Sequence, residues 1–158
     1  MSLAEYLSHR HISFRLVPHP ETHAANRMAA VLHLPGREVA KTVMLRADRG
    51  YVYVVAVLPA DCRVDTLMVS QMLGGCEINL ATEREICERC PDCERGVLPP
   101  FGSLYGMRTI VDTRLARCDE ITFEGETHHE AITMSFGDFR RTEEPLIGDF
   151  ARRASERL

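Results

Sequence analysis

The sequence has no excess of positive charge. Its 158 residues include 19 Lys and Arg against 23 Asp and Glu, which gives a formal net charge of −4. A chain of this charge has no basic field over its whole surface. Any contact with nucleic acid must therefore be local, or confined to one end of a large RNA.

Long apolar runs are also lacking. No stretch approaches the about 20 apolar residues that a membrane-spanning helix needs, so we expect no membrane partner. Residues 1–11 lack the basic start and apolar centre that are typical of a signal peptide. We therefore expect a cytoplasmic location.

The common motifs of nucleophilic and nucleotide chemistry are absent. The sequence contains no G-x-S-x-G, no Walker A loop and no G-x-G-x-x-G, and no single cysteine has an evident histidine partner. Nucleotide hydrolysis and dinucleotide binding are thus left without support. If the chain is an enzyme, we expect it to position water or groups of the substrate, with backbone donors polarising the reacting bond.

Six cysteines are present, and three of them stand close together. Cys87, Cys90 and Cys93 form two overlapping C-x-x-C spacings, which suit half of a zinc site with Cys76 as a fourth ligand. The alternatives are a redox pair, or thiols without a special role at a helix end and in a loop. Without a second C-x-x-C pair we expect no metal and no other cofactor, and without an export signal we expect no disulfide framework.

The length and the patterning predict one α+β domain over residues 1–158, with a core of about 10–142 and a helical tail over 143–158. The expected helices cover 2–9, 22–34 with Thr22 as N-cap, 65–73 with Asp65 as N-cap, and 82–87 behind a capping box of Thr82 and Glu85. The expected strands cover 12–17, 41–46, 51–58, 77–80, 107–112, 120–123 and 130–134, with a turn at 48–50. A helix starts at Ser135 or Asp138, and 147–158 form a final amphipathic helix. The apolar run at 51–58 predicts a central strand.

The loop 96–102 is the most distinctive stretch of the chain. Glycines stand at both ends of the loop, two prolines restrict its backbone dihedral angles, and one aromatic residue lies inside it. These residues are Gly96, Pro99, Pro100, Phe101 and Gly102. A stiff loop of this kind can present backbone groups to a small ligand, and these five residues are our substrate-binding candidates. The alternative is a plain turn between two strands.

Three side chains are candidates for catalysis. Lys41 opens a strand that otherwise has a core pattern, where its ammonium is either a fixed charge for a phosphate or carboxylate, or an edge charge that reaches solvent. His128 and His129 follow a glycine turn and precede a strand, so at most one of them faces a given pocket. The alternative for both is an ordinary surface position. His19 and His23 are weaker candidates of the same kind.

With these pieces in place, the chain resembles the YbaK / prolyl-tRNA-synthetase-associated family of aminoacyl-tRNA deacylases. The resemblance covers about residues 10–142, and residues 33–42, 91–102 and 125–132 carry it. It implies a compact α/β domain with a curved, mostly antiparallel sheet or partial barrel surrounded by helices. It also implies trans-editing, the hydrolysis of the ester that joins a wrong amino acid to tRNA, most often the tRNA for proline.

The resemblance assigns roles to the candidates as well. The lysine that matches Lys41 contacts the terminal adenosine or its phosphate, and the loop 96–102 supplies backbone contacts around the ester. The family's reaction needs no protein nucleophile. The partners implied are a mischarged tRNA, contacted at its acceptor end, and an aminoacyl-tRNA synthetase or another factor that adds affinity.

The amino acid that is removed stays open, because a small pocket discriminates one methylene by only about 1–3 kcal/mol. The residues expected to size that pocket are Val17, Met28, Leu32, Val43, Leu45 and Met134. Two other functions also stay open. One is a non-catalytic domain of the same fold that binds a small ligand or an aminoacyl-adenosine, and the other is a zinc-binding module.

Overall fold

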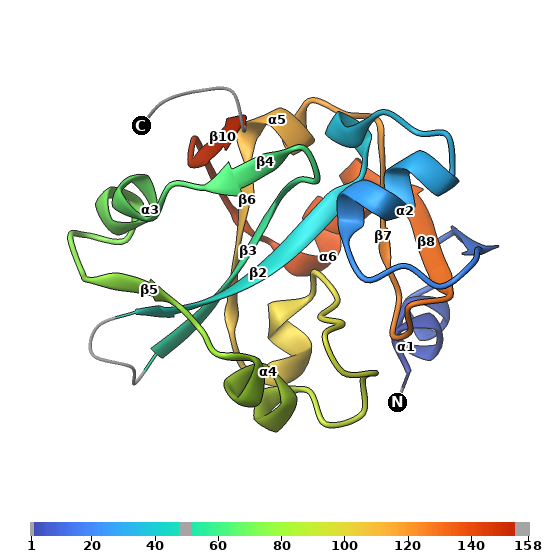
Figure 1. Cartoon of the computed structure of the whole chain (residues 1–158), viewed down its shortest axis with the longest axis horizontal. Helices are drawn as coiled ribbons and strands as arrows, with labels where there is room; N and C mark the ends of the chain where they lie inside the picture. Colours follow the sequence, from blue (N-terminus) through green and yellow to red (C-terminus); the bar gives the residue numbers. More distant parts are fainter. Residues whose placement is uncertain (1, 48–51, 154–158) are drawn as a thin grey trace.

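A five-stranded sheet runs through the middle of the molecule in this computed structural model, which describes residues 2–47 and 52–153 (Figure 1). Its order is β5 (Ile78–Leu80), β2 (Ala40–Ala47), β3 (Val52–Pro59), β6 (Arg108–Asp112) and β9 (Leu146–Gly148). β2 pairs antiparallel with β3 and β5, whereas β6 lies parallel to both β3 and β9. The expected turn at 48–50 lies outside the described residues.

The central position expected for the apolar run is confirmed, since β3 lies between β2 and β6. Residues Val54 to Leu58 are at most 3% exposed, because the strand is covered on both faces. Alternate side chains of the strand enter two different core clusters. Burial on both faces explains why the run is continuous rather than alternating.

A second sheet consists of β1 (Phe14–Pro18), β8 (Glu130–Ser135) and β7 (Glu120–Glu124), all antiparallel. A bridge between Val39 and Thr122 joins this sheet to the start of β2. A third pair is formed by β4 (Cys62–Val64) and β10 (Ala151–Arg153). The prediction of one mixed α/β domain is confirmed, and the sheets are open.

The capping signals worked as expected at three helices: Ser2 before α1 (Leu3–His9), Asp65 before α3 (Thr66–Met72) and Thr82 with Glu85 at α4 (Glu83–Arg89). Ser135 caps α6 (Phe136–Glu143). Two further helices, α2 (Ala25–Val31) and α5 (Thr113–Ala116), and the 3₁₀ turns η1 (Gly36–Glu38) and η3 (Gly102–Tyr105) complete the set in the described residues. Helices α3, α4 and α5 lie around the central sheet, whereas α6 lies near the middle of the molecule (Figure 1).

The expected start of the second helix is wrong. α2 begins at Ala25 with Ala24 as N-cap, and not behind Thr22. The backbone N–H of Thr22 donates to the carbonyl of His128 at 3.1 Å, and that of His19 donates to the carbonyl of His129 at 2.8 Å. These bonds to the turn before β8 hold the segment 19–24 out of the helix, so tertiary contacts override its helical pattern.

The expected final helix over 147–158 is also wrong where the structure describes it, because β9 and β10 cover Leu146–Gly148 and Ala151–Arg153, while residues 154–158 lie outside the described part of the chain. Asp112 explains the difference. Its buried carboxylate accepts hydrogen bonds from the backbone N–H groups of Phe150 and Ala151, both at 2.8 Å. The segment therefore satisfies its backbone groups against β6, β4 and Asp112 rather than within a helix.

No helix of residues 2–47 and 52–153 is both long and apolar enough to cross a membrane.

Candidate functional site

A cavity of about 330 Å³ lies where the start of β2, the segment before α2, the loop after α4 and the end of β7 meet. Its polar wall contains a lysine, a glutamate and a histidine, and much of the remaining wall is alanine. The lining residues are His23, Ala24, Ala25, Asn26, Ala40, Lys41, Thr42, Ala60, Gly96, Leu98 and Glu124. The cavity therefore combines ionisable groups with room for a small apolar group.

Lys41 is the only lysine of the sequence, and it lies in this wall. Its Nζ donates a hydrogen bond of 2.6 Å to the carbonyl oxygen of Cys62, which fixes the end of a flexible side chain. Burial lowers the pKa of the Lys41 amine, while the charges of Cys62 and Asp61 act in the opposite direction. The ammonium is thus held in place beside the cavity.

Glu124 faces the same cavity from the end of β7, although it was not among the residues predicted from the sequence. Burial raises the pKa of its carboxyl from 4.5 to about 7, with a further rise from Glu94 and an opposing effect of His128. A carboxyl with such a pKa can both accept and donate a proton near neutral pH. The only signal in the sequence was a charged residue directly after the apolar end of a strand.

His128 lies behind the cavity rather than in its wall, with 3% of its surface exposed. Its Nε2 is 2.8 Å from the carbonyl oxygen of Arg95. Since a carbonyl only accepts, Nε2 carries the proton of that bond. The other nitrogen, Nδ1, is 3.9 Å from Glu124 and has no hydrogen-bond partner in the described residues. The ring also packs against that of His23, with 4.2 Å between centroids and 40° between the ring planes.

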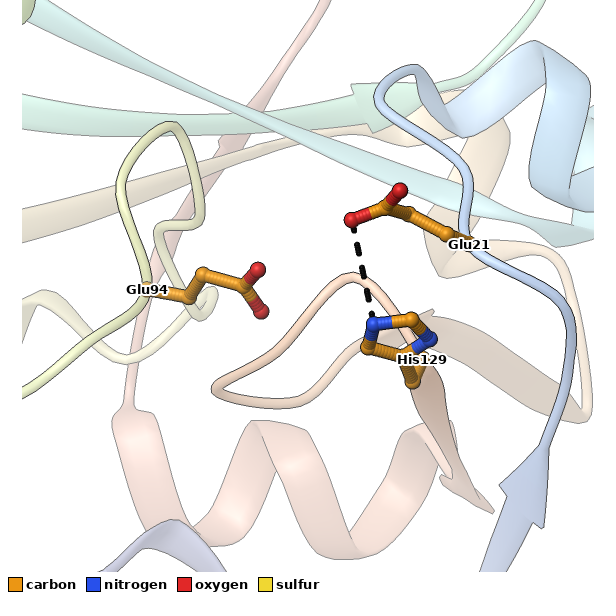
Figure 2. A group of neighbouring side chains, drawn as sticks. All are labelled: Glu21, Glu94 and His129. Carbon is orange, nitrogen blue, oxygen red and sulfur yellow. Dashed lines mark ion pairs between the residues drawn. The ribbon is translucent and has the colours of Figure 1, made fainter.

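His129 points to the surface and is absent from the lining of the cavity in the described residues. Figure 2 shows it beside Glu21 and Glu94, with its Nε2 3.8 Å from Glu21. The donor atoms of these three side chains lie within 4.8 Å of one another, a spacing that suits a metal ion. The structure thus separates the two predicted histidines, and a catalytic role for either of them stays a prediction.

Only part of the loop 96–102 reaches the cavity. Gly96 and Leu98 line it, whereas Pro99, Pro100, Phe101 and Gly102 are buried. Phe101 is fully buried in a cluster of aromatic rings, with centroids 6.1 Å from Tyr6, 5.8 Å from Phe123 and 5.2 Å from Phe139. The packing of Phe101 against these rings fixes the loop on the core. Contact of the four buried residues with substrate stays a prediction.

The residues expected to size the pocket lie elsewhere. Met28, Leu45 and Met134 are at most 1% exposed and belong to the core clusters. Val17 and Leu32 line a separate cavity of about 210 Å³ near β1, and Val43 is half-buried against a core cluster. Alanines take their place in the candidate site.

Cys90 and Cys93 form a disulfide at the end of α4, although no disulfide framework was expected. Cys90 ends the helix, and the turn that follows brings the two Cα atoms to 5.7 Å, a distance typical of disulfides. The zinc alternative needs both of these sulfurs as thiolates, whereas the redox alternative needs a pair of this spacing. Cys87 is a free, half-buried thiol.

Solved structures show the same fold. Hypothetical protein APE2540 matches with a TM-score of 0.85 and 20% identity, over 95% of this chain and 99% of that one. A proposed trans-editing enzyme for prolyl tRNA synthetase matches with a TM-score of 0.81 and 18% identity, over 95% and 94%. A proposed signal transduction protein from Marinobacter aquaeolei VT8 matches with a TM-score of 0.63 and 24% identity, over 89% of this chain and 27% of that one.

No curated protein matches the sequence significantly. The sequence pattern of the aminoacyl-tRNA editing domain, in contrast, matches residues 19–142. This range includes all the residues that line the candidate site. The chain therefore belongs to the family of aminoacyl-tRNA editing domains.

Proposed function

We propose that the protein is a trans-editing hydrolase that deacylates mischarged aminoacyl-tRNA in the cytoplasm. The observation that supports this best is the meeting of Lys41, Glu124 and the backbone of Gly96 at one small cavity inside the matched range. Its substrate in this proposal is the tRNA for proline carrying a small wrong amino acid. The relative described as a trans-editing enzyme for prolyl tRNA synthetase supports that choice, and so does a synthetase as partner.

In this proposal the aminoacyl group enters the alanine-rich part of the cavity. Ala24, Ala25, Ala40 and Ala60 leave room for a small side chain. The ammonium of Lys41, held by the carbonyl of Cys62, binds the phosphate or hydroxyl oxygens of the terminal adenosine as a fixed point charge. Lys41 and the alanine-rich wall together orient the ester against the backbone of Gly96.

A water molecule then attacks the ester carbonyl. Glu124 accepts the proton of this water and returns it to the ribose oxygen as the ester bond breaks, because a pKa of about 7 populates both of its forms. No cysteine or serine lines the cavity within the described residues, which agrees with a reaction that needs no protein nucleophile. His128 lies behind Glu124, with 3.9 Å between its Nδ1 and the carboxylate.

The test is deacylation of tRNA for proline loaded with alanine, cysteine or serine. Wild type should release one of these amino acids, and Lys41→Ala and Glu124→Gln should each be slower by about 100-fold. Lys41→Arg keeps the charge and should lose less than Lys41→Ala. Arg84→Gln is the control, because Arg84 pairs with Glu88 on the exposed surface of α4 and does not line the cavity.

If the Lys41→Ala and Glu124→Gln variants both release the amino acid as fast as wild type does, the roles assigned to these two residues are contradicted. No release from any of the three charged tRNAs would contradict hydrolysis of these substrates. That result would favour the alternative of a non-catalytic domain that binds a small ligand or an aminoacyl-adenosine.

A further inference from the structure

A second cavity, of about 370 Å³, has an unusual charge. Four arginines and a single carboxylate line it, and we call it the arginine cavity. Its lining residues are Arg37, Pro59, Asp61, Cys62, Arg114, Arg117, Cys118 and Arg153. The chain as a whole is negative, with a net charge of −4, so this is a local concentration of positive charge.

The four arginines come from segments that lie far apart in the sequence. Arg37 lies in η1, Arg114 in α5, Arg117 directly after it and Arg153 at the end of β10. Figure 1 shows that α5, β4 and β10 lie at the same end of the molecule. Asp112 holds this arrangement together, since it caps α5 and also binds the backbone of Phe150 and Ala151 ahead of Arg153.

The chemistry of these side chains favours phosphate as the ligand. A guanidinium presents several planar N–H donors that fit phosphate oxygens, and it keeps its charge at every physiological pH. Arg37, Arg117 and Arg153 are exposed and can reach a ligand from solvent. Arg114 is half-buried and donates to the Sγ of Cys62 at 3.3 Å, which places its guanidinium at the base of the cavity.

The arginine cavity and the candidate site share a wall. Ala60 faces the candidate site, whereas the next two residues, Asp61 and Cys62, face the arginine cavity. The hydrogen bond from Lys41 to the carbonyl of Cys62 crosses the same wall. The two cavities are thus neighbours, and a phosphate follows at each nucleotide of an RNA strand whose 3′ end lies in the candidate site.

We propose that the arginine cavity binds a backbone phosphate of the RNA strand whose 3′ end enters the candidate site. This inference rests on the proposed function, since it assumes an RNA end in that site. A contact between the arginines and a backbone phosphate would give this protein of negative net charge a local site for tRNA. Contacts of this kind supply affinity independently of base sequence. Free phosphate has the same chemistry, and the experiment distinguishes the two sources.

The experiment measures binding of an unacylated RNA minihelix that ends in CCA, by fluorescence anisotropy at several salt concentrations. Arg37→Gln, Arg117→Gln and Arg153→Gln should each weaken binding by about fivefold and reduce the slope of log K against log salt by about 0.7 to 1. Arg84→Gln and Arg140→Gln are matched controls on exposed parts of α4 and α6, and they should bind as wild type does. Circular dichroism of each variant verifies that it is folded.

Unchanged affinity and salt slope in all three variants would overturn the proposal, and so would a failure of wild type to bind the minihelix. Inorganic phosphate, added at constant ionic strength, should compete only at millimolar concentration. Tight binding of phosphate with no RNA binding would assign the cavity to a free anion and overturn the RNA assignment. Because the minihelix carries no ester, an arginine-dependent affinity supports the inference even if deacylation fails, so the two failures are distinguishable.

Discussion

The Nζ of Lys41 donates a hydrogen bond of 2.6 Å to the carbonyl oxygen of Cys62. The two residues lie on neighbouring walls, Lys41 in the candidate site and Cys62 in the arginine cavity. A lysine side chain is flexible in solution, and this bond fixes its charge at one place. The ammonium therefore stands between the site proposed for the ester and the site proposed for a backbone phosphate.

We predict that Lys41 can be labelled selectively and that a substrate analogue protects it. As the sequence has one lysine, an amine-reactive ester has only Lys41 and the N-terminal amine to modify. Burial lowers the pKa of Lys41, which increases the fraction of reactive free amine at a given pH. A stable aminoacyl-adenosine analogue should slow modification of Lys41 severalfold, as measured by mass spectrometry, and leave the N-terminal amine unaffected. Equal rates at Lys41 with and without the analogue would contradict its place in the site.

We predict that Glu124→Gln changes how stability depends on pH. The pKa of Glu124 is raised from 4.5 to about 7, so between these values the folded state binds more protons than the unfolded state. The stability of wild type therefore falls as pH rises through this window, and the variant lacks this loss. Urea unfolding from pH 4.5 to 7.5 should show the variant gaining about 2 to 3 kcal/mol relative to wild type. Glu120→Gln, at the exposed start of the same strand, is the control, and parallel curves for wild type and Glu124→Gln would disprove the effect.

We predict that Gly96→Ala affects both stability and deacylation, whereas Gly74→Ala affects stability alone. Gly96 has φ +84° and Gly74 has φ +90°, so alanine should cost about 1 to 2 kcal/mol at either position. A Cβ on Gly96 would lie 3.6 Å from Nε2 of His128 at the edge of the cavity, whereas a Cβ on Gly74 meets no atom within 4 Å. Urea unfolding and deacylation rates separate the two effects. Equal deacylation rates in the two variants would argue against a role of Gly96 in the site.

Local signals in the sequence were reliable where short-range chemistry decides the structure. The capping residues Ser2, Asp65 and Thr82 each accept the expected backbone hydrogen bond, because capping depends on residues only a few positions apart. The segments after Pro20 and after Pro145 were predicted as helix and are partly extended. Distant groups, the backbone of His128 for the first and the carboxylate of Asp112 for the second, satisfy their N–H groups.

The sequence by itself determined the class of fold, the central strand, the family resemblance and Lys41 as a candidate, since each of these depends on patterning or on a short motif. Only the tertiary structure decided that Glu124 faces the cavity, that neither His128 nor His129 is among the described residues lining it, and that Phe101 packs into the core. Burial and convergence depend on contacts between distant segments, and no local pattern encodes them. The same holds for the arginine cavity, whose charge arises because the fold brings residues 37, 114, 117 and 153 to one place.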